Sequence, residues 1–134
     1  MSIDYYAVAE RNEEAMMAVL ESDDDGALPP IAASALADRI TSRFPAFERF
    51  VKDFAAIAKT MGITEEDARP NFGGAELNWT EDGYIQVEIS NAFVHVSHGF
   101  DGGDLQFEVL EGLIALFKEA GLSVWDPQNE TWLD

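Results

Sequence analysis

The sequence contains no cysteine and only eight Lys and Arg among its 134 residues. Without cysteine the chain can form no disulfide, no reactive thiolate and no zinc site built from thiolates, which suits a reducing compartment. So few basic residues also leave little positive surface with which to bind nucleic acid or an anionic membrane. We therefore expect neither nucleic acid nor a membrane as a partner.

Long apolar segments are absent as well. No run approaches the ~18 residues that a membrane-spanning helix needs. Residues 1–6 lack both the basic and the apolar region of a secretory signal. These observations predict a cytoplasmic protein.

Motifs for catalysis, metal binding and cofactor binding are also missing. Residues 73–74 and 102–103 are glycine pairs that match no phosphate-binding pattern, and the segment 101–104 lacks the ligand spacing of a calcium loop. His95 and His98 are three positions apart in a strand-like segment, which places them on opposite faces rather than together as a metal pair. We expect a partly buried, hydrogen-bonded His95 and an exposed His98. No metal, cofactor or catalytic residue is expected, and the chain is not predicted to be an enzyme.

Acidic residues dominate what is present. The 26 Asp and Glu give a formal net charge of -18, and residues 70–134 hold twelve acids against Lys118 alone. Because 47% of the residues are hydrophobic and 11% aromatic, this charge belongs to a folded domain rather than to a disordered acidic tail. An acidic surface attracts basic proteins and speeds their association, although solubility alone also explains such a charge.

Helical periodicity, with apolar residues three and four positions apart, occurs in four segments. The predicted helices cover residues 12–22, 32–44, 45–62 and 104–120. Asn12 and Asp104 are suited to cap the first and the last of them. Gly62 and Gly121 are suited to end the third and the fourth.

Alternation with a period of two predicts strands at 3–9, 76–80, 85–89 and 93–97, of which the last three form an antiparallel meander. Residues 122–125 complete the sheet, and residues 131–133 are expected to pair back on them.

The order of these elements favours one α+β domain over residues 1–134. We expect a two-layer sandwich in which a mostly antiparallel sheet carries the helices on one face, as a variant of the ferredoxin-like topology. Ile85, Val87 and Ile89 would then be buried, whereas Gln86 and Glu88, with Tyr84 nearby, would lie on the uncovered face.

Aromatic residues close to acids suggest anchors for a basic partner. A large flat side chain ringed by carboxylates is typical of such an interface, although for Trp79 and Trp125 a position in the sheet–helix core is the favoured interpretation. The predicted partner-binding residues are Trp79, Glu81, Asp82, Glu88, Asp101 and Asp126.

The segment from Glu119 to Gln128 runs from a predicted helix through Gly121 into an apolar strand that stops at Asp126-Pro127-Gln128. This ending is expected to be structural, because proline ends a strand and an aspartate can close the turn. Together with the size and charge of the chain, it resembles small acidic bacterial α+β proteins that include predicted immunity proteins of toxin–immunity systems. The resemblance implies an inhibitor that covers the active site of a basic toxin.

Two other functions stay open. A pocket between helices and sheet would indicate a small-molecule-binding or accessory domain. An enzyme with an acid-based site is a further alternative, since 26 acids guarantee some adjacent carboxylates.

Overall fold

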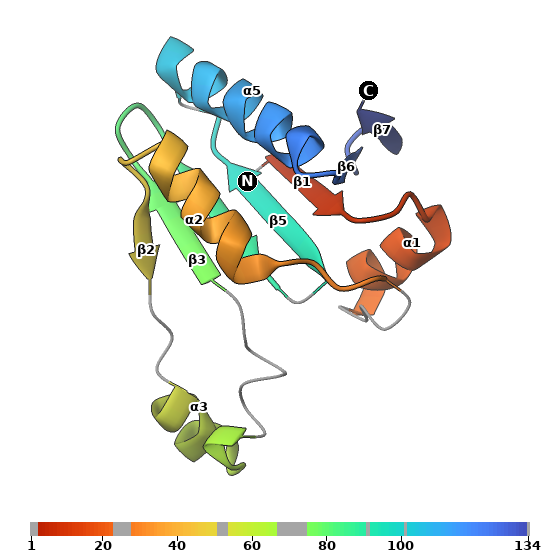
Figure 1. The fold of residues 1–134 in the computed structure, drawn as a ribbon, viewed down its shortest axis with the longest axis vertical. Coiled ribbons are helices and arrows are strands. Elements are labelled where there is room, and N and C mark those ends of the chain that lie inside the picture. The colour runs from red at the N-terminus through yellow and green to blue at the C-terminus, as the bar shows by residue number, and fades with distance from the viewer. Residues whose placement is uncertain are drawn as a thin grey trace.

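Seven strands form one open antiparallel sheet in the order β2-β3-β4-β5-β1-β6-β7 (Figure 1). The computed structural model describes residues 3–22, 28–50, 54–66, 75–90, 92–100 and 102–133. The strands are β1 (Ile3–Val8), β2 (Glu48–Phe50), β3 (Ala75–Trp79), β4 (Ile85–Ile89), β5 (Phe93–His98), β6 (Ser123–Asp126) and β7 (Thr131–Leu133). The helices in the described residues are α1 (Glu13–Ser22), α2 (Ala33–Arg43), α3 (Phe54–Met61) and α5 (Asp104–Glu119). The predicted α+β class, the β3–β4–β5 meander and the pairing of β7 with β6 are confirmed.

The main core lies between the sheet and the helices α2 and α5. Because strand side chains alternate between faces, β4 turns Ile85, Val87 and Ile89 inward, where each is at most 2% exposed. These residues pack in one cluster with Leu36 of α2 and Leu113 of α5. The predicted buried face of β4 is confirmed.

Helix α1 departs from the expected one-sided arrangement. Its Met16 belongs to a second cluster with Val8 of β1 and Trp125 of β6, whereas the neighbouring Ala7 and Val124 belong to the main core. Adjacent strand residues point to opposite faces, so α1 covers the other face of the sheet at the β1–β6 end. The prediction that all helices lie on one face is therefore wrong for α1, because Val8 of β1 and Trp125 of β6 make the other face apolar at this end of the sheet.

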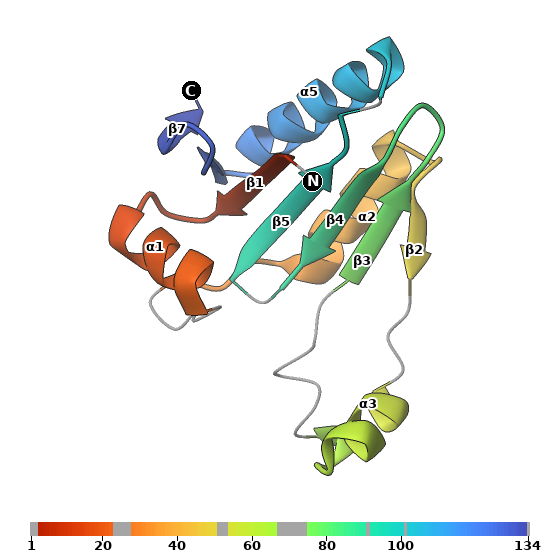
Figure 2. The ribbon, with the colours of Figure 1, turned by 180° about the vertical axis from the view of Figure 1, so that it is seen from behind.

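The segment 45–62 does not form the single helix that its periodicity predicted. Residues Glu48–Phe50 form the edge strand β2, which pairs with β3 through Arg49 and Leu77. Helix α3 begins only at Phe54 and lies apart from the sheet (Figures 1 and 2). Ladder hydrogen bonds to β3 and burial of the Phe47 side chain, which is 4% exposed, outweigh a weak local helical preference.

Three of the predicted helix ends are confirmed. The Asn12 side chain accepts a 3.0 Å hydrogen bond from the Ala15 N–H and so caps α1. Gly62 and Gly121 follow α3 and α5 with positive φ angles of 70° and 83°, the conformation that favours glycine after a helix. None of the helices in the described ranges has both the length and the apolar character needed to cross a bilayer.

Candidate functional site

From β2 to β5, none of the described helices covers the sheet face that is turned away from α2 and α5 (Figure 2). Strand alternation places one set of side chains on this face. We call this set, together with Tyr84 just before β4, the open sheet face. Its members are Asp4, Glu48, Phe50, Glu76, Asn78, Tyr84, Gln86, Glu88, His95 and Ser97. None of these described positions is a Lys or Arg.

Two glutamates stand directly opposite each other at the centre of this face. Glu76 of β3 and Glu88 of β4 are cross-strand partners, an arrangement of like charges that destabilises a sheet. The Gln86 amide Nε2 lies between them, 2.8 Å from Glu76 Oε1 and 3.4 Å from Glu88 Oε1. Asn78 Nδ2 donates a further bond of 3.4 Å to Glu76. The neutral amides of Gln86 and Asn78 thus partly offset the repulsion between the two glutamates. A Lys or Arg in place of either glutamate would remove that repulsion.

Tyr84 joins the same network. Its hydroxyl donates a 2.6 Å hydrogen bond to Gln86 Oε1. Burial raises the pKa of Tyr84, and the carboxylates of Glu76 and Glu88 raise it further, so the phenol stays protonated at neutral pH. The Tyr84 side chain is 39% exposed and that of Phe50 is 58% exposed. The open sheet face therefore presents two accessible aromatic rings beside its carboxylates.

His95 lies next to the glutamate pair, on the side of β1. Its Nε2 is 2.8 Å from Asp4 Oδ1, and its ring stacks on Tyr6 with centroids 4.7 Å apart. Ser97 Oγ donates to the same Asp4 oxygen at 3.3 Å. The prediction for His95 is confirmed. Since the serine hydroxyl bonds the aspartate and not the histidine, the three residues lack the nucleophile–base contact of a hydrolytic triad.

His98 is on the opposite face, and its predicted exposure is wrong. It alternates inward with the buried residues of β5 and is only 4% exposed, with Nδ1 3.0 Å from the Gly99 carbonyl. Gln106 of α5, which the helical pattern places on the polar side of its helix, is 1% exposed beside it. The Gln106 amide accepts a 2.9 Å bond from the Tyr84 N–H and donates a 3.0 Å bond to the Gly99 carbonyl. It therefore fixes Tyr84 at the end of the open sheet face.

Two of the predicted partner-binding residues are buried. Trp79 is 1% exposed within the main core, and Asp126 is 5% exposed. Asp126 accepts hydrogen bonds from Gln128 N at 3.0 Å and Asn129 Nδ2 at 2.8 Å, and so closes the β6–β7 turn as the Asp-Pro-Gln motif predicted. Gln128 in turn bonds the backbone of Asp4 at 2.8 Å. A docking partner would reach neither Trp79 nor the Asp126 carboxylate, so both leave the predicted set. The alternative that Trp125 fills the core is confirmed, since it is 1% exposed.

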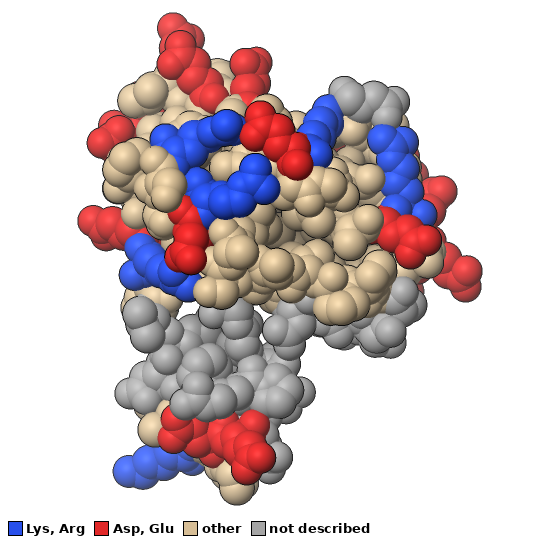
Figure 3. Space-filling model, viewed as in Figure 1, with Lys and Arg blue, Asp and Glu red and all other residues tan. Residues whose placement is uncertain are grey.

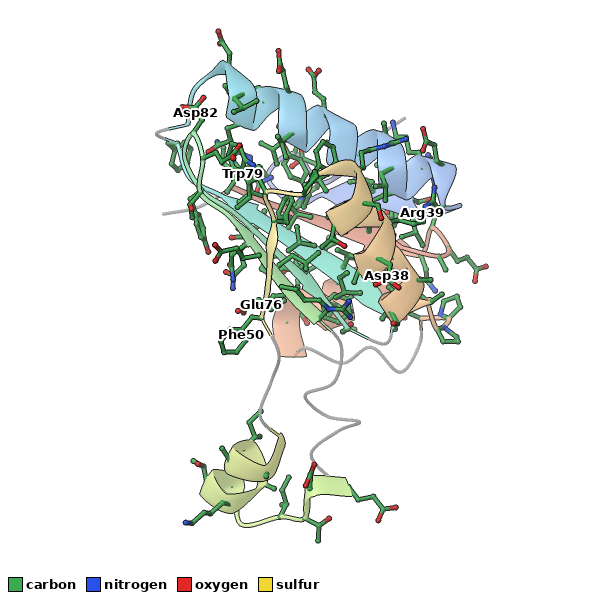
Figure 4. The ribbon with its side chains drawn as sticks, turned by 60° about the vertical axis from the view of Figure 1, so that its left-hand side comes forward. Asp38, Arg39, Phe50, Glu76, Trp79 and Asp82 are labelled. Atoms are coloured by element: carbon green, nitrogen blue, oxygen red, sulfur yellow. The ribbon has the colours of Figure 1, made fainter. Side chains whose placement is uncertain are left out.

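Asp82 has a structural function at the start of α5 (Figure 4). Its Oδ2 accepts a 3.2 Å bond from the Leu105 N–H, which satisfies one of the free amides of the first helical turn. Asp104 was predicted to be this cap and is not, because the N-cap position is Gly103 and the Asp82 side chain arrives from the β3–β4 turn.

Two of the remaining predicted residues are exposed. Glu88 lies on the open sheet face, and Glu81 lies in the turn between β3 and β4, at the end of that face. Asp101 lies outside the described residues. Sequence reasoning missed Asp4, Glu76 and Phe50, although the period-two pattern of β3 marked Glu76 as outward. Within the described ranges, no cluster of three or more His, Asp or Glu is arranged to hold a metal ion.

No protein-family model, curated protein or solved structure matches this chain. Its function is therefore inferred from the geometry and charge of the open sheet face.

Proposed function

We propose that this chain is an acidic protein-binding module that uses the open sheet face to bind a basic partner. The observation that carries the proposal is the unneutralised pair Glu76 and Glu88, with no Lys or Arg among the described positions around it. A partner's Arg or Lys placed between the two carboxylates would remove their repulsion. Residues that reduce the stability of the free protein in this way are typical of functional surfaces.

The type of partner follows from charge and shape. A net charge of -18 opposes binding of the phosphates of nucleic acid, whereas it speeds the approach of a basic protein. Phe50 and Tyr84 offer exposed rings, and aromatic side chains are enriched among the residues that contribute most to binding. Carboxylates would steer the partner, and the rings would then be desolvated against it.

An immunity protein is the specific form of this proposal. A cytoplasmic protein of this kind would neutralise a basic toxin domain, such as a nuclease, by laying the open sheet face over its cationic active-site cleft. The size, the charge and the Asp126-Pro127-Gln128 ending, which resemble immunity-protein-like chains, support this form. Inhibition would need no cofactor and no catalytic residue.

We also propose that the central part of the sheet is a ferredoxin-like variant. The strand order β4-β5-β1-β6, with α5 connecting β5 to β6, supports this description. The strands β2, β3 and β7 and the helix α1 are then additions around that centre.

The test is a pull-down from host lysate with wild type and two charge-reversed variants. Glu76→Lys/Glu88→Lys reverses the open sheet face, and Glu108→Lys/Glu111→Lys makes the same charge change at exposed positions of α5. Washes at about 50 mM and about 500 mM salt separate screened contacts from desolvated ones.

We expect one basic protein to be recovered in stoichiometric amount by wild type and by the α5 variant, to survive the high-salt wash, and to be lost with the sheet variant. Recovery of only salt-labile proteins, or equal recovery by both variants, would contradict the proposal.

A further inference from the structure

Helices α2 and α5 lie side by side on the covered face of the sheet and leave a groove between them. At one end they touch closely, because the Phe44 ring occupies the space beside Gly112, where an added Cβ would lie 2.5 Å from Phe44 Cζ. Beside this contact the surface carries a shallow, open groove of about 450 Å³, which we call the α2–α5 groove. Its lining residues are Asp38, Arg39, Ser42, Arg43 and Leu116. Figure 3 shows basic side chains gathered on this side of the molecule.

A second, smaller hollow of about 140 Å³ lies near the start of α2 and is lined mostly by apolar residues, and we call it the apolar cavity. The two share Arg39, so this side chain stands at the boundary between a polar and an apolar compartment. The remaining residues of the apolar cavity are Ile31, Ala32, Ala35, Leu36, Ala120 and Leu122. A ligand that fills both compartments needs an apolar body and a polar head.

The polar compartment has the charge to hold one carboxylate. The Nη2 atoms of Arg39 and Arg43 lie 3.8 and 3.2 Å from the same oxygen of Glu119. Two guanidinium groups thus converge on a single carboxylate and keep one positive charge in excess. Asp38, the acid among the residues that line the groove, is paired with Arg49 at 3.1 Å. Guanidinium groups bind carboxylates through paired N–H donors.

We infer that the α2–α5 groove binds an aliphatic monocarboxylate, with its head on Arg39 and Arg43 and its chain in the apolar cavity. A head with several negative charges would be repelled by the net charge of -18 and would exceed the single spare positive charge. The groove and the open sheet face lie on opposite sides of the sheet, as the positions of Arg39 and Glu76 show (Figure 4). Ligand binding in the groove is therefore independent of the proposed function.

The first test is isothermal titration of the full chain with octanoate, octanol and acetate. Octanoate carries both the head and the chain, whereas octanol lacks the charge and acetate lacks the chain. We expect saturable one-to-one binding of octanoate, with binding at least about tenfold weaker for each of the other two. No heat of binding from octanoate at millimolar concentration, or equal binding of either comparator, would overturn the inference.

Matched variants then locate the site. Arg39→Gln should weaken octanoate binding roughly tenfold, whereas Lys59→Gln on α3 removes the same charge and should leave it unchanged. Glu119→Gln removes the internal competitor and should strengthen binding. Ala35→Phe, at an exposed position that lines the apolar cavity, should abolish it.

A control for added bulk is Ser34→Phe, which introduces the same side chain at the neighbouring exposed position outside the lining, and we expect it to bind octanoate normally. Because both Phe variants alter exposed positions, a far-ultraviolet circular dichroism spectrum like that of wild type is expected from each. Equal affinity of wild type and the Arg39 and Ala35 variants would show that octanoate binds elsewhere and would overturn the inference.

Discussion

Replacing Gln106 by Met removes the amide that joins α5 to the end of the sheet while keeping a side chain of similar length and volume. In the native protein the amide oxygen accepts from the Tyr84 N–H at 2.9 Å, and the amide nitrogen donates to the Gly99 carbonyl at 3.0 Å. The side chain is 1% exposed, so water has little access to replace either bond.

The size of the effect depends on which partners are left unsatisfied. After the substitution, the Gly99 carbonyl still has His98 Nδ1 at 3.0 Å. Loss of the bond from Gln106 to this carbonyl therefore costs as much as one ordinary hydrogen bond, about 1 kcal/mol. The Tyr84 N–H loses the Gln106 acceptor, and an unsatisfied part-buried donor costs about 1–3 kcal/mol. We expect Gln106→Met to lower the free energy of unfolding by about 2–4 kcal/mol.

Urea denaturation monitored by circular dichroism measures this change. With an m-value of about 2 kcal/mol/M, the unfolding midpoint should fall by roughly 1–2 M at unchanged m. A loss below about 0.5 kcal/mol would be incompatible with these two hydrogen bonds, because the Gln106 amide would then stabilise the protein no more than a Met side chain of similar volume does.

A double-mutant cycle supplies the control. A Cβ at Gly102 would overlap the Gln106 amide, so Gly102→Ala should destabilise wild type clearly more than it destabilises the Gln106→Ala variant. Equal destabilisation by Gly102→Ala in the two backgrounds would show that the Gln106 side chain does not lie beside Gly102.

Three further substitutions test the contacts around the open sheet face. Asp82→Ala removes the side-chain acceptor of the Leu105 N–H and should cost about 1 kcal/mol in urea denaturation; no loss would contradict its function as the cap of α5. Asp126→Ala leaves the donors of the β6–β7 turn unpaired and should cost about 2–3 kcal/mol in the same assay, whereas a neutral result would contradict its function in closing that turn. Glu88→Gln should stabilise the protein by about 0.2–1 kcal/mol by removing a like-charge pair. It should also lower the pKa of Tyr84 toward its usual value, measured by ultraviolet titration of the phenol, and an unchanged titration would contradict the assigned geometry.

Local signals predicted the parts of the fold that local interactions determine. Alternation along β4 predicted burial of Ile85 and Val87, and side-chain chemistry predicted the Asn12 cap and the helix end at Gly121. Each depends on residues within a few positions along the chain. The α+β class followed from the order of such elements.

Predictions failed where distant residues decide the structure. The periodicity of residues 45–62 is compatible with a helix, but pairing with β3 turns Glu48–Phe50 into a strand. Gln106 belongs to the polar side of its helix by pattern, yet the Tyr84 N–H and the Gly99 carbonyl draw it into the interior. Neither partner is adjacent to it in the sequence.

The candidate site was predictable in part for the same reason. The outward positions of Gln86 and Glu88 followed from alternation within β4. The register that sets Glu76 opposite Glu88 and brings Asp4 to His95 joins separate strands, so composition and spacing did not reveal it. Proximity to acids selected Trp79, but burial in the core determines its position.

Carboxylate footprinting of the complex with the captured partner would decide whether the open sheet face is the binding surface. Carbodiimide coupling to an amine, read by mass spectrometry, reports the accessibility of each exposed Asp and Glu. We predict that Glu76 and Glu88 react in the free protein and are protected in the complex, while Glu108 and Glu111 of α5 react equally in both. Protection of the α5 residues with continued reaction of Glu76 and Glu88 would show that the partner binds elsewhere.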